Sequence, residues 1–320
     1  LLLRHGTRLT ASPPSAPVPA AQYDGVDAPA LARRLGVPSV HLYDTVASTM
    51  DLAHALAESG APAGTLVLSD AQETGRGRQG RGWTSEPGKG IWMTLVERPD
   101  ESSGVEVLSL RIGLAIAEAL EPFASAPIRL KWPNDVFVAE GKLAGILSEG
   151  RWRSGRLDWL AIGIGVNVRP PAAVPAGATA GALRPGVSRL EVLAALLPTV
   201  RAAAAAYGPL DAGEVARFHA RDLAVGRAVV SPGRGVVAGI EDVVVVGRPS
   251  EHWGEEVIAI VRPRRDPTGN RRGNCPTIGD RCLRPTTLHS RLDSQRFVGH
   301  RSPPGGTGQP AVSARSCRCP

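Results

Sequence analysis

Three arginines alternate with glycines in the segment GRGRQGRGW, which runs from Gly75 to Trp83. Arg76, Arg78 and Arg81 repel one another, and ordering glycine is costly, so the segment is not expected to pack by itself. Arginine offers planar, bidentate donors to phosphate and carboxylate groups, and glycine lets backbone N–H groups approach an anion. The segment therefore predicts an anion-binding loop. A disordered RNA-binding stretch is the alternative, but the segment lies between ordinary apolar segments rather than in a low-complexity tail.

A second group of reactive side chains is the segment KWPND, from Lys131 to Asp135. Pro133 disfavours helix at Trp132 and interrupts a strand, so the neighbouring side chains can project toward one site. Lys131, Asn134 and Asp135 supply a cation for phosphate, an amide donor and a carboxylate for a metal. An Asx turn at a strand end would explain Asn134 and Asp135 alone. Together with the Arg/Gly loop (residues 75–83), the segment favours a ligand site.

Two glycine-containing strands follow. In GKLAGIL (141–147), Lys142 opens the strand and Gly145 leaves it without a side chain, which suits close approach of a flat ligand. A plain hairpin with one exposed lysine is the alternative. In GIGVN (163–167), alternating glycines at Gly163 and Gly165 expose backbone, and the segment ends with the amide of Asn167. Because no helix start follows, this spacing is not a dinucleotide-binding fingerprint.

The surrounding sequence predicts the elements that position these segments. Apolar spacing and capping residues predict helices over 48–59, 105–120, 188–207 and 211–220, and strands over 65–69, 91–96, 128–131, 136–138, 143–148 and 157–166. We expect an α+β fold with a mixed, largely antiparallel sheet, helices on one side of it, and a small β module after Gly226.

Composition limits the function classes. No stretch approaches the ~18 uninterrupted apolar residues of a membrane span, and no apolar core of signal-peptide length follows the first residues. We therefore expect a soluble, cytoplasmic protein. The whole chain has a net charge of +7, and residues 264–320 alone carry +8. The preceding residues therefore sum to −1, so they do not form a basic nucleic-acid-binding domain. All four cysteines lie in that tail, which excludes a cysteine nucleophile in the body.

Four regions differ in composition. Residues 1–40 read as a disordered leader, because the stretch before residue 30 is rich in Pro, Ala and Ser without periodicity. Residues 41–225 form the expected catalytic domain, and 226–263 the small β module. Residues 264–320 lack apolar periodicity and read as a disordered basic tail that is dispensable for activity.

Taken in order, the four segments and the Ser48-Thr49 and Gln72 positions resemble the biotin protein ligases over about residues 41–240. That family shares its adenylating fold with lipoate ligases and class II aminoacyl-tRNA synthetases. The resemblance implies that the biotin carboxylate attacks the α-phosphate of Mg²⁺-ATP, and that a lysine of a biotin carboxyl carrier domain then attacks the biotinyl-adenylate. It also implies a loop that closes over the ligand and excludes water.

The resemblance also implies roles for single residues. Lys142 and Arg78 are the expected catalytic residues, with Lys142 neutralising the carboxylate and the α-phosphate. The expected biotin-binding residues are Ser48, Thr49, Gln72, Arg76, Gly77, Arg78, Lys142, Gly145, Gly163 and Gly165. The expected ATP-binding residues are Arg78, Arg81, Trp83, Lys131, Asn134, Asp135 and Asn167, with Asp135 as the candidate Mg²⁺ ligand.

The sequence departs from the family pattern in three places. Met50 follows Ser-Thr where the family usually has Asn, which puts one polar contact in doubt. The composition of the first forty residues does not support a winged helix-turn-helix, so we expect the non-repressor class, without DNA binding, as a monomer or weak homodimer. Residues 226–240 resemble the opening of the family's SH3-like domain, whereas 242–263 resemble part of an acyl-CoA synthetase C-terminal domain.

Two other functions compete with this interpretation. A lipoate or octanoate ligase would share the fold, but that branch lacks the Arg/Gly loop with KWPND in this form. A non-enzymatic RNA-binding protein would use the Arg/Gly stretch and the basic tail, and would show salt-sensitive RNA affinity without ATP-dependent label transfer.

Overall fold

The computed structural model describes residues 15–174, 177–229, 235–236, 240–250 and 254–263. The predictions for residues 1–14 and for the tail 264–320 lie outside the described residues. In the part of the chain that the structure describes, no helix is long and apolar enough to cross a membrane.

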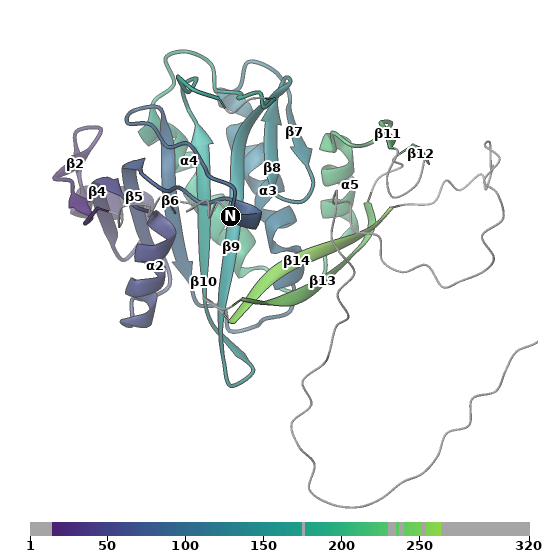
Figure 1. The fold of residues 1–320 in the computed structure, drawn as a ribbon, viewed down its shortest axis with the longest axis horizontal. Coiled ribbons are helices and arrows are strands. Elements are labelled where there is room, and N and C mark those ends of the chain that lie inside the picture. The colour runs from purple at the N-terminus through teal and green to yellow at the C-terminus, as the bar shows by residue number, and fades with distance from the viewer. Residues whose placement is uncertain (1–14, 175–176, 230–234, 237–239, 251–253, 264–320) are drawn as a thin grey trace, which may run out of the picture. The chain divides into compact units, whose positions relative to one another are not determined.

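One ten-stranded sheet organises the fold (Figure 1). Its strands, in sheet order, are β1 (Val18–Pro19), β4 (Val40–Val46), β5 (Thr65–Gln72), β6 (Gly90–Glu97), β10 (Arg156–Asn167), β9 (Gly141–Arg153), β14 (Gly254–Pro263) and β13 (Ile240–Ser250), with β7 (Ile128–Lys131) and β8 (Asp135–Val138) joined to β9. The β4–β5 pair is parallel and the other described pairs of this sheet are antiparallel. The expected mixed, largely antiparallel sheet is confirmed.

Helices cover both faces of this sheet, which corrects the expectation of helices on one side. The helices are α1 (Ala28–Leu35), α2 (Thr49–Glu58), α3 (Leu108–Leu120), α4 (Arg189–Ala205) and α5 (Ala212–Arg221). Leu160, Ile162 and Ile164 of β10 belong to the large core with α1, α3 and α4, whereas Trp159 packs with α2. The signal for two covered faces is in β6, whose residues are buried in succession instead of alternating.

The helix ends follow local capping rules. Ser48 is the N-cap of α2, with its hydroxyl accepting from the Met50 N–H at 3.3 Å. Asp211 and Glu214 form a complete capping box at the start of α5. These side chains satisfy N–H groups that have no partner within the helix, so the starts of both helices are set by the sequence.

Residues 15–40 are ordered, so the expectation of a disordered leader is wrong for this stretch. Asp27 caps α1 and Gly36 ends it in the left-handed conformation at φ 64°. Leu31 is fully buried in the large core. A helix of eight residues is too short to be stable alone. Its order therefore comes from packing that composition does not reveal, although the Asp27 and Gly36 caps were readable in the sequence.

Arg189, at the first turn of α4, joins the N-terminal segment to the main sheet. Its guanidinium pairs with Asp24 and with Asp70, and it lies 4.4 Å from the ring centroid of Tyr23. Burial raises the pKa of Tyr23, so its hydroxyl stays neutral and donates to the Gly90 carbonyl at 3.2 Å. The cluster joins residues separated by 165 positions in the sequence.

Replacing Arg189 with Met is expected to lower the free energy of unfolding by about 2 kcal/mol, because two carboxylates lose a buried partner but keep partial contact with solvent. Arg201→Met on the same helix is the matched control. The Arg201 side chain is 34% exposed and pairs with one carboxylate, Glu97, instead of two, so its loss should cost about 1 kcal/mol. Urea denaturation of both variants measures the difference, and equal costs would contradict the anchoring role.

The expected C-terminal β module is only partly separate from the main sheet. Short strands β11 (Ala228–Val229) and β12 (Gly235–Val236) form their own pair. By contrast, β13 and β14 form a hairpin, and Glu255 of β14 pairs with Gly150 of β9. The hairpin therefore extends the main sheet, a long-range pairing that short β runs in the sequence could not specify.

Candidate active site

Strand register brings the expected glycines together. Gly145 on β9 pairs directly with Gly165 on β10, and Asp135 on β8 pairs with Gly145. A Cβ atom built on Gly165 would lie 2.4 Å from Nε1 of Trp83, and one on Gly145 would lie 2.9 Å from Trp83 Cζ3. The flat group that approaches these glycines here is the indole ring of Trp83. Glycine is required at both positions because any side chain would displace that ring.

Lys142 lies at the centre of this arrangement. Its Nζ is 2.7 Å from Oδ1 of Asp135 and 5.0 Å from the ring centroid of Trp83. The Lys142 carbonyl accepts from the Asn167 side-chain amide at 3.2 Å. The side chains of Lys142 and Asp135 are 33% and 22% exposed, so the ammonium group is paired but accessible. It can exchange Asp135 for an incoming carboxylate or phosphate.

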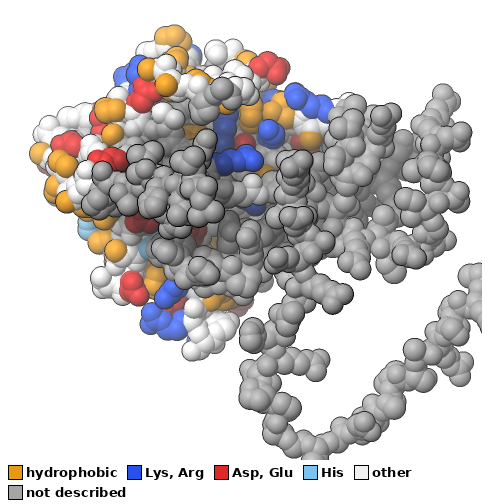
Figure 2. Space-filling view, in the orientation of Figure 1, with side chains coloured by type: hydrophobic (Ala, Val, Ile, Leu, Met, Phe, Trp, Pro, Cys, Tyr) orange, Lys and Arg blue, Asp and Glu red, His pale blue; other side chains and the backbone are white. Residues whose placement is uncertain are grey.

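Basic side chains gather on the same region of the surface. Figure 2 shows Lys and Arg side chains in blue toward the upper middle of the drawn face, over the end of the sheet that carries β7 and β8. This concentration of positive charge favours anionic ligands over neutral ones.

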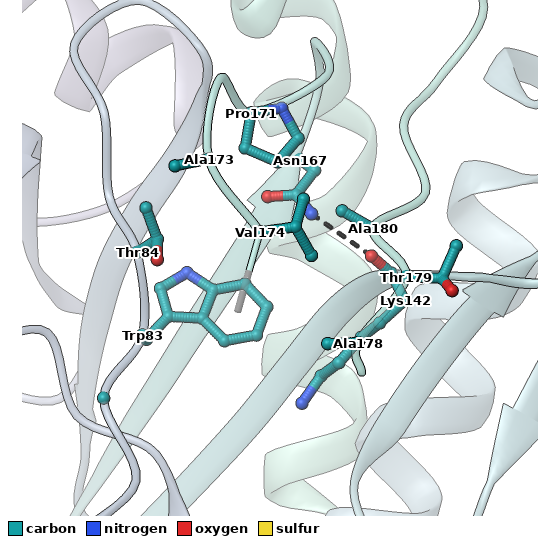
Figure 3. Close-up of a pocket in the computed structure, with 11 residues that line it drawn as sticks. Trp83, Thr84, Lys142, Asn167, Pro171, Ala173, Val174, Ala178, Thr179 and Ala180 are labelled. Atoms are coloured by element: carbon teal, nitrogen blue, oxygen red, sulfur yellow. Dashed lines mark hydrogen bonds between the residues drawn. The ribbon is translucent and has the colours of Figure 1, made fainter. Parts of the chain in front are cut away.

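A pocket of about 180 Å³ opens beside Trp83 and Lys142. Figure 3 shows it bounded by three segments: Trp83 and Thr84 of the loop, Lys142 and Asn167 of the strands, and residues from 171–174 and 178–180. Apart from Thr179, the third segment lines the pocket with small apolar side chains that have no chemical signature, so sequence reasoning missed it. The indole Nε1–H of Trp83 is buried and has no hydrogen-bond partner among the described residues. Such a donor is costly to leave unpaired, which points to a ligand acceptor.

A second polar group lies at the start of α2. Gln72 accepts from the Thr49 N–H at 2.9 Å and from its hydroxyl at 3.1 Å, and donates to Ser85 at 2.8 Å. The Thr49 hydroxyl is also 2.9 Å from that of Thr94. The structure thus brings Thr49 and Gln72 together as expected and adds Thr94 and Ser85. Thr94 could have been noticed as the polar residue within the apolar run IWMTLV.

Met50 occupies the position where the family pattern has Asn. It is buried, and its terminal methyl lies against Gly163, where a Cβ atom would be only 2.7 Å away. Gly163 pairs with Thr94 on the adjacent strand. Met50 therefore places a buried apolar side chain beside the Thr49–Gln72–Thr94 group.

The Arg/Gly loop has a defined backbone, so the expectation that it does not pack by itself is wrong. The Trp83 N–H donates to the Gly75 carbonyl and the Gly77 N–H to the Arg81 carbonyl, both at 2.7 Å. A 3₁₀ turn covers Arg78–Gly80. Glycines let the two sides of this narrow turn approach closely, and these backbone bonds offset part of the ordering cost.

Arg76 is held by carboxylates of two other elements. Its Nη2 lies 2.7 Å from Oδ1 of Asp51 on α2 and 3.8 Å from Oε2 of Glu149 on β9. Sequence reasoning expected Arg76 at the ligand but did not identify these partners. Glu149 carried a weak signal, as an acidic residue within a strand after the GKLAGIL segment.

The KWPND segment divides between two roles. A tight turn with a cis peptide bond before Pro133 joins β7 to β8. Asp135 reaches Lys142, whereas the Asn134 amide donates to the Ile146 carbonyl at 2.7 Å and so fixes the turn on β9. Lys131 is exposed, with its ammonium group 5.6 Å from the ring centroid of Phe137. The roles expected for Asn134, Lys131 and exposed Arg81 at ATP stay predictions.

The described residues contain no group of three His, Cys, Asp or Glu side chains that could hold a metal ion. Asp135 is already paired with Lys142, so it does not form a metal site by itself. Mg²⁺ commonly binds through one or two carboxylates together with substrate phosphates. The donors present therefore fit a metal that arrives with a nucleotide rather than a resident one.

Comparison with known proteins agrees with this geometry. Residues 42–167 match the biotin/lipoate A/B protein ligase family. The biotin–(acetyl-CoA-carboxylase) ligase of Mycobacterium tuberculosis is 32% identical over 202 residues, which cover 60% of this chain and 71% of that protein. The bifunctional ligase/repressor BirA of Bacillus spizizenii is 42% identical over 126 residues, and the match spans only 39% of its length.

The fold is also found in a solved structure. The biotin protein ligase from Aquifex aeolicus in complex with biotin and ATP aligns with a TM-score of 0.54 and 26% identity, covering 70% of this chain and 99% of that one. The family match, the coverage of the mycobacterial relative and the shared fold lead to the same conclusion. This chain belongs to the biotin protein ligases of the biotin/lipoate A/B protein ligase family.

Proposed function

We propose that this protein is an ATP-dependent biotin protein ligase. A carboxylate oxygen of biotin attacks the α-phosphorus of ATP, pyrophosphate leaves, and biotinyl-5′-AMP forms. The neutral amine of an acceptor lysine then attacks the acyl carbon, AMP leaves, and the amide nitrogen loses a proton. The observation that carries the proposal is the accessible Lys142 ammonium group beside the Gly145–Gly165 backbone and the Trp83 ring.

Lys142 serves the first step as a compact cation. Binding of a carboxylate and a triphosphate places several negative charges at one point, and their repulsion opposes the attack. An ammonium group that leaves Asp135 can lie between the two anions and stabilise charge that develops on the α-phosphate. Asp135 provides a resting partner for Lys142 until the substrates arrive.

The two polar groups of the site suit the two substrates. The nucleotide would occupy the pocket beside Trp83 and Asn167, where the unpaired indole N–H can meet an acceptor. Biotin would lie nearer Thr49 and Gln72, whose amide and hydroxyl groups offer both donors and acceptors to a cyclic urea. Mg²⁺ would enter with the triphosphate, with Asp135 as its nearest carboxylate.

The acceptor would be the biotin carboxyl carrier domain of a biotin-dependent carboxylase, in line with the acetyl-CoA-carboxylase named for the mycobacterial relative. A lipoate or octanoate ligase is not favoured, because the relatives and the aligned structure are biotin ligases. An RNA-binding role is not favoured either, since Arg76 of the loop is paired with Asp51 and Glu149.

The proposal is tested by incubating the full chain with biotin, Mg²⁺-ATP and an apo carrier domain. We expect the mass of the carrier to rise by one biotinyl group at a single lysine, and pyrophosphate to be released. Parallel reactions with lipoate and octanoate separate the related ligases. Labelling with either acid but not with biotin would overturn the proposal, as would the absence of any acyl-adenylate.

Gly165→Ala is expected to raise the KM for ATP about tenfold, because the new methyl would displace the Trp83 ring and lose about 1–1.5 kcal/mol of contact. Gly113→Ala is the matched control, since a Cβ atom there makes only ordinary contacts of 3.6 and 3.7 Å. Steady-state pyrophosphate release measures both variants. An unchanged KM for ATP in Gly165→Ala would show that the Trp83 position is not needed for the nucleotide.

A further inference from the structure

A chain of buried polar side chains runs beneath the Arg/Gly loop and is not used by the proposed reaction. The indole Nε1–H of Trp159 donates to Nδ1 of His54 at 3.0 Å. Nε2 of His54 lies 2.9 Å from Oε2 of Glu149. The His54 side chain is 2% exposed and that of Glu149 is 14% exposed. The three residues come from β10, α2 and β9.

The chemistry of indole fixes the direction of these hydrogen bonds. An indole N–H can only donate, so Nδ1 of His54 must accept and carries no proton. The single proton of the neutral imidazole is then on Nε2, where it donates to Glu149. Trp159 thus sets the tautomer of His54, and the Nε2–H of His54 orients the Glu149 carboxylate by donating to its Oε2.

Glu149 connects this chain to the loop. Its Oε2, the atom that accepts from His54, is also 3.8 Å from Nη2 of Arg76. Asp51, on the exposed part of the first turn of α2, contacts the same Nη2 at 2.7 Å. The two carboxylates therefore bracket the first arginine of the Arg/Gly loop from two different elements.

We propose that His54 is a positioning residue for the Arg/Gly loop. It acts through Glu149: the oriented carboxylate receives Arg76, and the loop is held against α2 and β9 in a closed arrangement. This positioning has a kinetic consequence, slower release of the acyl-adenylate, which rests on the proposed function. Its structural consequence, protection of the loop, does not depend on that function.

Trypsin cleavage of the ligand-free full chain tests the structural consequence, because the loop offers cleavage sites after Arg76, Arg78 and Arg81. His54→Leu fills a similar volume but removes both hydrogen bonds. We expect loop cleavage about tenfold faster than in the parent protein for His54→Leu and for Glu149→Gln, as for the loss of a hydrogen bond to a charged group. Cleavage at Arg111, which is 6% exposed, reports global unfolding in the same digest.

Two further variants separate positioning from packing. In His54→Gln, the amide oxygen can accept from Trp159 and the amide nitrogen can donate to Glu149, so loop protection should be restored. Arg98→Met is the matched control, because Arg98 lies 5.7 Å from the ring centroid of Trp159 but donates to Ala57, Ala61 and Asp158, which lie outside the proposed chain of contacts. It should lower stability without accelerating loop cleavage.

A double-variant experiment tests the kinetic consequence. His54→Leu should accelerate release of the preformed adenylate about tenfold in the parent protein, but not in an Arg76→Gln background, because the proposed partner is then absent. The inference is overturned if His54→Leu leaves loop cleavage unchanged, or accelerates cleavage at Arg111 equally, or if its effect persists in the Arg76→Gln background. If no adenylate forms, the proposed function fails, and the protease result still decides the role of His54.

Discussion

Replacing Lys142 with arginine is expected to lower the rate of biotinyl-adenylate formation about a hundredfold, comparable to the loss of a preorganised electrostatic contact in other enzymes. The charge is retained, but a guanidinium is planar and wider than an ammonium group. The space for Lys142 is bounded by Asp135 at 2.7 Å and the Trp83 ring at 5.0 Å, which suits a compact cation. Because the side chain is partly exposed, the melting temperature should change little.

The chain offers a matched control for this substitution. The chain has three lysines, Lys89, Lys131 and Lys142, and no proposed contact involves the Lys89 side chain. Lys89→Arg makes the same chemical change there and should leave the adenylation rate at the parental value. Single-turnover formation of adenylate from biotin and Mg²⁺-ATP measures both variants. If Lys142→Arg forms adenylate at the parental rate, Lys142 has a structural role and its proposed role is wrong.

Arg78→Ala is expected to accelerate release of the bound adenylate by about ten- to a hundredfold, which corresponds to one charge-assisted contact of ~1.5–3 kcal/mol. Arg78 opens the 3₁₀ turn of the Arg/Gly loop and belongs to no apolar cluster of the described residues. The loss should therefore affect ligand retention more than folding. Released adenylate would also label nearby lysines of unrelated proteins.

Gln79→Ala is the control for Arg78→Ala, because it shortens the adjacent side chain of the same turn without removing charge. Adenylate release is followed by filter binding of the preformed complex, and non-specific labelling by mass spectrometry of a bystander protein. Release at the same rate from Arg78→Ala, Gln79→Ala and the parent protein would eliminate Arg78 as an adenylate-retaining residue.

Local sequence predicted the helices of the catalytic region well. The expected helices at 48–59, 105–120, 188–207 and 211–220 correspond to α2, α3, α4 and α5 within a few residues at their ends. Capping residues and apolar spacing are local signals, so they survive in a single sequence. The same holds for the reactive residue types, since the sequence alone indicates Lys142, Asp135 and Gly145, and the structure places them together.

Local signals failed where order depends on distant partners. Residues 28–35 form a helix because Leu31 enters a core built from β4 and α4, and a composition rich in Pro and Ala does not report that core. The Arg/Gly loop was not expected to pack by itself, but it is closed by backbone bonds and held by Asp51 and Glu149.

The sequence by itself determined which residues are present to do chemistry and the periodicity of the elements that carry them. Only the tertiary structure decided which of them meet: Asp135 rather than Lys131 beside Lys142, Trp83 over Gly165, and His54 joined to a glutamate 95 positions away. The physical reason is that periodicity specifies the face on which a side chain lies, but not the register of one strand against another. Register is set by the packing of the whole sheet, and a shift of one residue in a strand would turn Asp135, Lys142 or Glu149 to the opposite face.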